Sequence, residues 1–329
     1  MAYGPFSANK IQIGAETTAG TAVAADIVWR GPATSIVDER VIMRPGAEES
    51  VGLLVPTDRA YVAQLLARCQ FPETEATYEH LPHILAAGIK NASPSGAGPY
   101  TYSYSPGTSS ANTIKTYTIE TGNAIADDAY EMEYAFVESF TLTGRVGESW
   151  KVSANWVGRQ STATNLTGAL SLAAVEEILF QKTKLYIDAT GGTIGTTQKT
   201  GVLLEASVTV NTGIQPVFAA DGNLYFASHK VTVPTLEFNI TLELDGTSGV
   251  VETERAIHAS QAVRLIRLIT TGTNSREFTL DIAGKYDSVG AYQNSNGNTT
   301  VQLSGRAVYS STDSLYFTFE IDNNLTALP

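Results

Sequence analysis

Apolar and polar residues alternate strictly through the middle of the chain, between Phe136 and Gln160. Successive side chains of a β-strand point to opposite faces of a sheet, so this pattern predicts strands. The alternation is interrupted once, at Gly147-Glu148. One face then carries Phe140, Leu142, Gly144 and Val146 before the interruption and Trp150, Val152, Ala154 and Trp156 after it. The two runs and their glycine-containing turn predict an antiparallel hairpin with one dry and one solvated face.

Runs of the same kind occur on both sides of this hairpin. They predict further strands at Ile27–Trp29, Ser35–Met43, Tyr100–Tyr104, Thr113–Glu120, Lys184–Asp188, Val202–Val210, Lys230–Leu244, Val263–Ile269, Glu277–Lys285, Val301–Tyr309 and Leu315–Asp322. The charged segment Asp38–Glu49 contains Pro45-Gly46 and overlaps one of these strands. It predicts a polar hairpin or an extended loop that projects from a sheet. The segment Arg59–Phe71 fits a helix and a strand equally well.

Helical periodicity is clearest in Thr77–Lys90. Its apolar stripe follows the spacing i, i+3, i+4, i+7, i+8: Leu81, Ile84, Leu85, Gly88 and Ile89. Thr77 is the expected N-cap of this helix. Shorter helices are expected at Leu172–Phe180 and Val250–Ser260.

The order of strands, one helix and more strands occurs twice along the chain. The Ser/Thr/Asn/Gly-rich segment Ser161–Ala169 separates the two series. We therefore predict a mainly β protein with two tandem β-sandwich domains, residues 1–165 and 166–329, each with a flanking short α-helix. Residue identity between the halves is weak, so a duplication is a hypothesis at this point.

Composition narrows the function more than the fold. The 329 residues are 43% hydrophobic, so the chain is not disordered by composition. The net charge of −12 argues against binding the outside of a nucleic-acid duplex, which requires clustered Lys and Arg. Basic side chains are dispersed, and the segment VRLIRLI contributes only Arg264 and Arg267. No stretch is apolar enough to span a membrane, and the single cysteine, Cys69, is expected in the core.

Candidate chemistry is sparse. His80 and His83 lie three residues apart beside Glu79, a spacing that a metal site uses, but no third ligand cluster accompanies them. We interpret them as ordinary surface or helix-flank histidines. His229 and His258 are isolated, and no phosphate-binding loop, nucleophile elbow or zinc-protease motif occurs.

Paired carboxylates suited to sugar hydrolysis were also considered. Asp127-Asp128, Glu131 and Glu133 are the candidates, and a solvated turn and strand face is the preferred interpretation. The sequence therefore predicts no catalytic residue, no cofactor and no metal site, and the protein is not expected to be an enzyme.

Several segments together resemble a known family. They are IQIGAETTAGTA, YEHLPHILAAGIK followed by PYTYSYSP, SANTIKTYTIETGN, AYEMEYAFVESFTLTGRVGESWKVSANWVGRQ and LYFTFEIDNN. Their pattern and order resemble the major tail tube proteins of long-tailed bacteriophages, in the form with two tail-tube domains per chain. The resemblance covers most of the chain.

The resemblance implies a structural virion protein. Subunits would form rings, trimeric with pseudo-sixfold symmetry, that stack into a hollow tube through which viral DNA passes. The implied partners are the chain itself and the tape-measure, tail-tip and tail-terminator proteins, without a membrane. The implied location is the virion tail, and the host cytoplasm before assembly. Asp38–Glu49 is the candidate for reaching the next ring.

A virion decoration protein, an adhesin or a carbohydrate-binding β-sandwich is the alternative, and a glycan-active enzyme is a more distant one. The predicted loops are small and polar, without the aromatic clusters on which sugars stack. Loop composition therefore favours the tube subunit over both.

Overall fold

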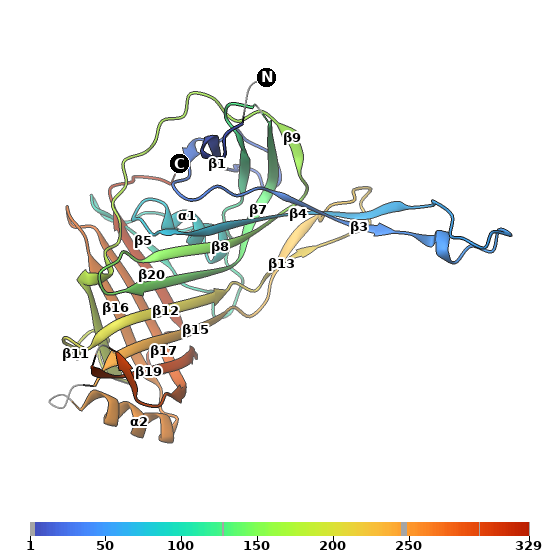
Figure 1. The fold of residues 1–329 in the computed structure, drawn as a ribbon. Helices are drawn as coiled ribbons and strands as arrows, with labels where there is room; N and C mark the ends of the chain where they lie inside the picture. The colour runs from blue at the N-terminus through green and yellow to red at the C-terminus, as the bar shows by residue number, and fades with distance from the viewer. Residues whose placement is uncertain (1–3, 127, 245–248, 296, 329) are drawn as a thin grey trace.

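The computed structural model of the protein describes residues 4–126, 128–244, 249–295 and 297–328, and it is mainly β, as the sequence predicts. Antiparallel strands form one large sheet that folds over on itself (Figure 1). The central hairpin is confirmed as β7 (Asp128–Arg145) and β8 (Lys151–Gly158), in which Phe140 lies opposite Ala154.

The remaining elements follow in two series. The first contains β1 (Asn9–Ala15), β2 (Ile27–Val28), β3 (Val37–Met43), β4 (Tyr61–Glu75), α1 (Leu81–Gly88), β5 (Tyr100–Tyr104), β6 (Tyr117–Asn123) and β9 (Thr162–Thr164). The second contains β10 (Thr183–Ala189), β11 (Gln198–Lys199), β12 (Leu203–Asn211), β13 (Ile214–Val217), β14 (Ser228–Val231), β15 (Thr235–Glu243), α2 (Val250–Ser260), β16 (Arg264–Thr271), β17 (Glu277–Val289), β18 (Gln293–Ser295), β19 (Asn298–Ala307) and β20 (Phe317–Asn323).

The order of strand pairing repeats. In the first series the neighbours run β1–β6–β7–β8–β4–β3, and in the second they run β10–β16–β17–β19–β15–β12. A β-bulge lies at the same place in both: between Val137 and Ser139 in β7, and between Tyr286 and Ser288 in β17. Each residue of the second pair follows its counterpart by 149 positions. The backbone plan is a repeat that weak residue identity conceals.

Two ladders cross the predicted boundary at residue 165. Strand β7 pairs with β12, and β5 pairs with β20. The main apolar core also contains residues from both halves. The rings of Phe140 and Phe319 lie 5.8 Å apart, as do those of Trp150 and Phe278, so the β7–β8 layer packs on the β17–β20 layer. The division into 1–165 and 166–329 stays a prediction.

The described part of the chain has two α-helices where three were predicted, and α1 is shorter than expected. Helix α1 begins at Leu81 instead of Thr77, whose Oγ1 accepts a hydrogen bond of 3.1 Å from the His80 N–H in the preceding turn. Helix α2 has the predicted bounds. Segment Arg59–Phe71 is strand β4 for most of its length.

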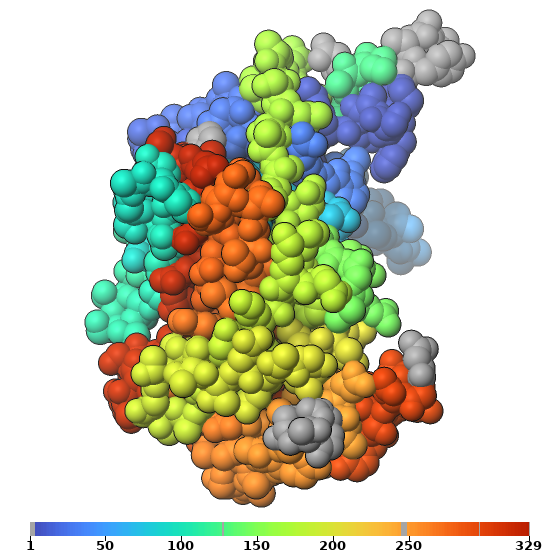
Figure 2. Space-filling view, turned by 90° about the vertical axis from the view of Figure 1, so that its left-hand side faces the viewer, coloured from blue at the N-terminus to red at the C-terminus, as the bar shows by residue number. Residues whose placement is uncertain are grey.

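The predicted helix at Leu172–Phe180 is wrong. The segment is extended, because neighbouring backbone groups take its hydrogen bonds: Ile178 N–H donates to Ala76 O at 2.9 Å, and Trp150 N–H donates to Ile178 O at 2.7 Å. Ile178 and Phe180 are buried while Leu179 between them is exposed, which is the period of a strand. It belongs to the connection between the two series, which runs over one face of the molecule (yellow-green in Figure 2).

Gly144 is a packing requirement of the central hairpin. A Cβ added there would collide with the ring of Phe180. We expect Gly144→Ala to reduce the free energy of unfolding by about 1–3 kcal/mol, since the buried ring cannot move aside without strain. Urea unfolding measures the change. Gly168→Ala, with nothing near its added Cβ, is the matched control, and equal stability of the two variants would contradict the assignment.

Candidate assembly surfaces

A long arm projects from the body of the molecule (Figure 1). It consists of β3, the first part of β4 and the segment between them, with Val37 opposite Arg68 at its base and Met43 opposite Tyr61 further out. The predicted projecting hairpin at Asp38–Glu49 lies in this arm and is confirmed. Within the arm, Thr57 Oγ1 donates to Glu49 at 2.8 Å, and Thr57 N–H donates to Gly46 O at 3.2 Å.

The arm is less polar than the sequence suggested. Its exposed large apolar side chains are Val37, Val41, Ile42, Met43, Val51, Leu53, Leu54, Val55 and Tyr61. Leu54 is fully exposed, at 106% of its reference area. Apolar side chains gathered on one projecting element indicate a contact surface, because isolated soluble chains rarely expose contiguous apolar patches.

The ladder between β7 and β12 joins the two repeats. Ser139 lies opposite Asn211, and Arg145 lies opposite Glu205. Just beyond the ladder, Thr212 donates from its backbone N–H to Glu138 O at 3.0 Å and from Oγ1 to Val137 O at 2.8 Å. We call this contact the closed joint. It joins the bulge of the first repeat to the end of β12 in the second repeat.

The counterparts of the closed joint are two strand edges at opposite ends of the repeat. Among the described residues, β3 pairs with β4 only, and the bulge half of β17 pairs with β19 only. Strand β3 is the counterpart of β12, and β17 is the counterpart of β7. The residues Asp38, Glu39 and Arg40 and the residues Asp287 and Ser288 are exposed. We call these two edges the open joint.

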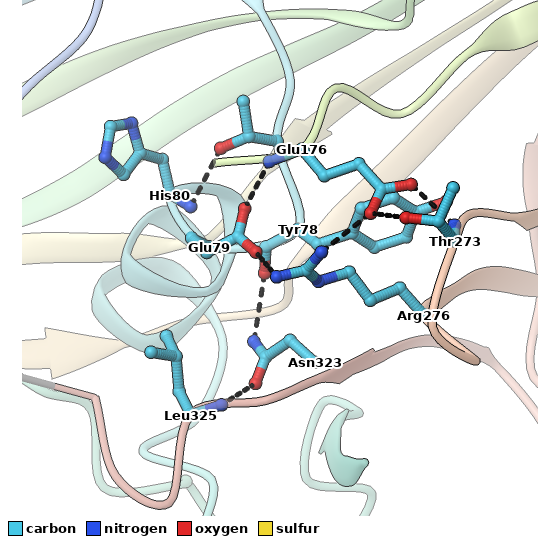
Figure 3. Close-up of polar contacts among 9 residues, drawn as sticks. Tyr78, Glu79, His80, Glu176, Thr273, Arg276, Asn323 and Leu325 are labelled. Carbon is cyan, nitrogen blue, oxygen red and sulfur yellow. Dashed lines mark hydrogen bonds and ion pairs between the residues drawn. The ribbon is translucent and has the colours of Figure 1, made fainter. Parts of the chain in front are cut away.

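A polar cluster ties the connection between the repeats to both of them (Figure 3). Glu176 receives hydrogen bonds from Thr273 Oγ1 and Arg276 Nη1 at 2.5 and 2.7 Å, and its own N–H donates to Glu79 at 2.9 Å. Arg276 Nη2 also lies 2.8 Å from Glu79 Oε1, as an ion pair whose angle does not make a hydrogen bond.

Opposite effects act on the two acids of this cluster. Burial raises the pKa of Glu79 above its ordinary value, although the Glu176 N–H and Arg276 oppose the shift. Partial burial also acts on Glu176, but the bonds from Thr273 and Arg276 outweigh it and lower its pKa. Asn323 Nδ2 donates to Tyr78 O at 2.9 Å, so the last strand is held here too. The cluster is a structural clamp.

His80, at the N-terminus of α1, and His83, within it, are both buried, so the surface interpretation is wrong. His83 is fully enclosed and its Nδ1 lies 3.0 Å from Tyr117 Oη, while the ring of His80 stacks on Trp29 at 4.9 Å. Burial lowers the pKa of His80 to about 4 and that of His83 to about 3. All residues of α1 are buried, whereas a single apolar stripe predicts that the opposite face of the helix is exposed to solvent.

The described carboxylates that the sequence offers for sugar hydrolysis, Asp128, Glu131 and Glu133, all lie on strand β7. Asp127 lies outside the described residues. Burial raises the pKa of Glu131 and Glu133, and Gln160 Nε2 donates to Glu133 at 3.2 Å. Both acids lie within β7, and Glu133 is buried, so the solvated-face interpretation is wrong for Glu133.

The other singled-out residues have structural partners. Cys69 is buried, which raises its pKa to about 12. His229 Nδ1 lies 3.2 Å from Tyr134 Oη. Arg264 pairs with Glu254, and Arg267 pairs with Asp281. Within the described ranges there is no group of three or more metal-ligating side chains, and no helix there has the length and apolarity that a membrane span needs.

No protein-family model matches the chain, and no curated protein matches it. The fold alone defines an antiparallel β protein made of a repeated pairing plan, with an apolar projecting arm and an open copy of its internal joint. The projecting arm and the open joint are therefore the surfaces from which we infer a function.

The buried histidines predict acid sensitivity. The unfolded imidazoles, with a pKa near 6.5, take up protons as the pH falls, whereas the folded ones stay neutral until about pH 4. Stability is thus fully present above pH 6.5 and declines as the pH falls through this window. At pH 5 each buried histidine should lower the free energy of unfolding by about 2 kcal/mol.

We expect His80→Phe to reduce the stability difference between pH 7 and pH 5, because phenylalanine can keep the stacking on Trp29 without a proton equilibrium. Urea unfolding at both pH values measures it. The control His258→Ala leaves both buried imidazoles in place and should keep the full acid loss. An unchanged pH difference in His80→Phe would refute the explanation.

Proposed function

We propose that the protein is a structural subunit of a bacteriophage tail tube, which assembles with copies of itself into rings that stack around a channel for viral DNA. The observation that carries the proposal is the repeat, with one closed joint inside the chain and one open joint at its ends. The finer fold that goes with it is two tandem tail-tube-type β-sandwich domains, each with one helix.

The open joint favours a ring. Its two edges lie on different surfaces of one chain, so the contact between copies is head-to-tail, and such contacts generate closed rings when the rotation closes. Pairing the edges also removes exposed backbone donors and acceptors that would otherwise invite uncontrolled aggregation. Three chains would supply three closed joints within chains and three between them. This supports the trimeric ring with pseudo-sixfold symmetry.

The repeat also gives a register for the contact. Val37 and Thr209 are counterparts, because their partners Arg68 and Glu237 lie opposite Val157 and Arg306, which differ by 149 positions. A residue of β12 therefore follows its counterpart in β3 by 172 positions, so Thr212 corresponds to Arg40. Glu138, which Thr212 contacts, corresponds to Asp287. The same joint between copies would place Arg40 opposite Asp287, two opposite charges.

The arm supports stacking. Its apolar tip stands away from the body (Figure 1), and in this proposal it contacts a subunit of the neighbouring ring. The net charge of −12 suits a channel wall that DNA must pass without binding. In this proposal the subunit resides in the host cytoplasm until assembly and in the virion tail afterwards, with tape-measure, tail-tip and tail-terminator proteins as partners and no catalytic activity.

Negative-stain electron microscopy of the purified chain at rising concentration, with and without virion tail tips as nuclei, tests the function. We expect stacked rings with an open channel. Discrete particles without rings under both conditions would overturn the proposal and favour a decoration protein, adhesin or carbohydrate-binding module.

A charge exchange tests the register of the joint. Arg40→Asp and Asp287→Arg should each weaken ring formation about tenfold, because an attractive cross-strand pair becomes repulsive. The double variant should recover most of it, since the opposite charges face each other again. Sedimentation velocity measures the ring fraction. The control Lys184→Asp makes the same charge change at an exposed position of β10, and failure of the double variant to recover would reject this register.

The arm tip should act in stacking and not in ring closure. Leu53→Ser with Leu54→Ser removes exposed apolar area, at about 25 cal/mol per Å² buried on contact. We expect single rings and short stacks in electron micrographs in place of long tubes. Val233→Ser, another strongly exposed apolar position, should leave tube length unchanged. Normal tubes from the Leu53/Leu54 variant would remove the arm tip from the stacking contact.

A further inference from the structure

Side chains of α2 and of Gln261, the residue that follows it, cover the β17 edge of the open joint. Gln261 Nε2 donates to Tyr286 O at 3.3 Å, His258 Nε2 lies 3.1 Å from Asp287 O, and Arg255 Nη2 donates to Gly290 O at 2.9 Å. Two backbone carbonyls of β17 and the carbonyl of Gly290, just beyond its end, are therefore bonded by side chains instead of by a neighbouring strand. Helix α2 lies at one end of the molecule (Figure 1), where it contacts β17.

Two of these carbonyls are the counterparts of the carbonyls bonded in the closed joint. Tyr286 and Asp287 follow Val137 and Glu138 by 149 positions, and both pairs sit at the bulge. In the closed joint their acceptors are satisfied by Thr212, which belongs to the incoming chain segment. In the open joint the same acceptors are satisfied by Gln261 and His258. The α2 side chains occupy the place of a strand.

The two helices differ at this point in the way that the two joints require. At the closed joint α1 presents Gly88, and a Cβ added there would lie 3.0 Å from Thr212 Cγ2 and 3.3 Å from Val137 Cβ. Because Gly88 has no side chain, the incoming segment fits against the helix. At the open joint α2 presents three long side chains in the corresponding region.

Helix α2 itself is firmly anchored. Glu254 accepts two hydrogen bonds from Arg264, at 2.9 and 2.6 Å, and one from Tyr286 Oη at 3.1 Å, and Glu254 is fully buried. Removing one partner of a buried pair is strongly destabilising, so the helix is not expected to leave. Gln261 is exposed, and Arg255 and His258 are partly exposed, so breaking their bonds to the carbonyls does not require the helix to move.

We propose that α2 is a placeholder that keeps the open joint covered in the free subunit, and that Val37–Arg40 of a second copy replaces its side-chain bonds during ring closure. This inference rests on the proposed function and adds its regulation. Each closure exchanges hydrogen bonds already made for new ones, so association between free subunits is slowed. A preformed ring or tail tip, which holds the incoming segment in place, favours the exchange.

The test removes the cover and keeps the helix. The variant combines Arg255→Ala, His258→Ala and Gln261→Gly, the last chosen because Gln261 has a left-handed φ of 55° that glycine adopts freely. The concentration at which unnucleated rings form should fall by about tenfold, since the acceptors no longer exchange existing bonds. Light scattering measures the lag before assembly, and sedimentation velocity measures the ring fraction.

The matched control is Glu252→Ala with Thr253→Ala, on the exposed face of the same helix, and it should assemble like the unaltered chain. If the triple variant is too unstable to measure, His258→Ala alone replaces it and should also lower the concentration at which rings form. Equal or weaker assembly of the uncovered variants, beside an unaltered chain that forms rings, would overturn the placeholder and leave the function standing. Failure of every variant and of the unaltered chain, even with nuclei, would overturn both.

Discussion

The structure depends on one backbone ladder, the contact of β7 with β12. Strand edges carry rows of hydrogen-bonding groups that are costly to leave unpaired. This ladder satisfies one such pair of edges inside the chain. Because the pairing plan occurs twice, the same two kinds of edge recur at the ends of the repeat. One of them is covered by helix side chains and the other continues into the projecting arm, so the need to pair backbone groups shapes both ends of the molecule.

The two helices occupy equivalent places and do different work. Helix α1 is buried on every side, with its histidines inside the core, and its terminal glycine makes room for the chain segment that enters the closed joint. Helix α2 is buried on one side only and covers a strand edge with its polar residues. The connection between the repeats, held by Glu176 to Arg276 and Glu79 (Figure 3), fixes the relation of the halves without belonging to either joint.

The sequence predicted those features that short-range periodicity controls. The central hairpin, most of the strands and the bounds of α2 follow from alternation or helical spacing within one element, because side-chain direction there depends on local backbone geometry alone. The projecting hairpin at Asp38–Glu49 was visible from its charge and its Pro-Gly pair. The apolar residues at its tip, Leu53-Leu54, stand in the sequence, but no periodic pattern indicates that they are exposed.

Tertiary structure decided the rest. Segment Leu172–Phe180 is extended because distant residues, Ala76 and Trp150, take its backbone hydrogen bonds. His80 and His83 are buried because distant residues, Trp29 and Tyr117, pack against them, which a helical stripe does not reveal. The repeat itself appears only in the pairing order, since different side chains can fill the same backbone plan once their apolar faces agree. Which strand neighbours which is a long-range choice, and local sequence carries little record of it.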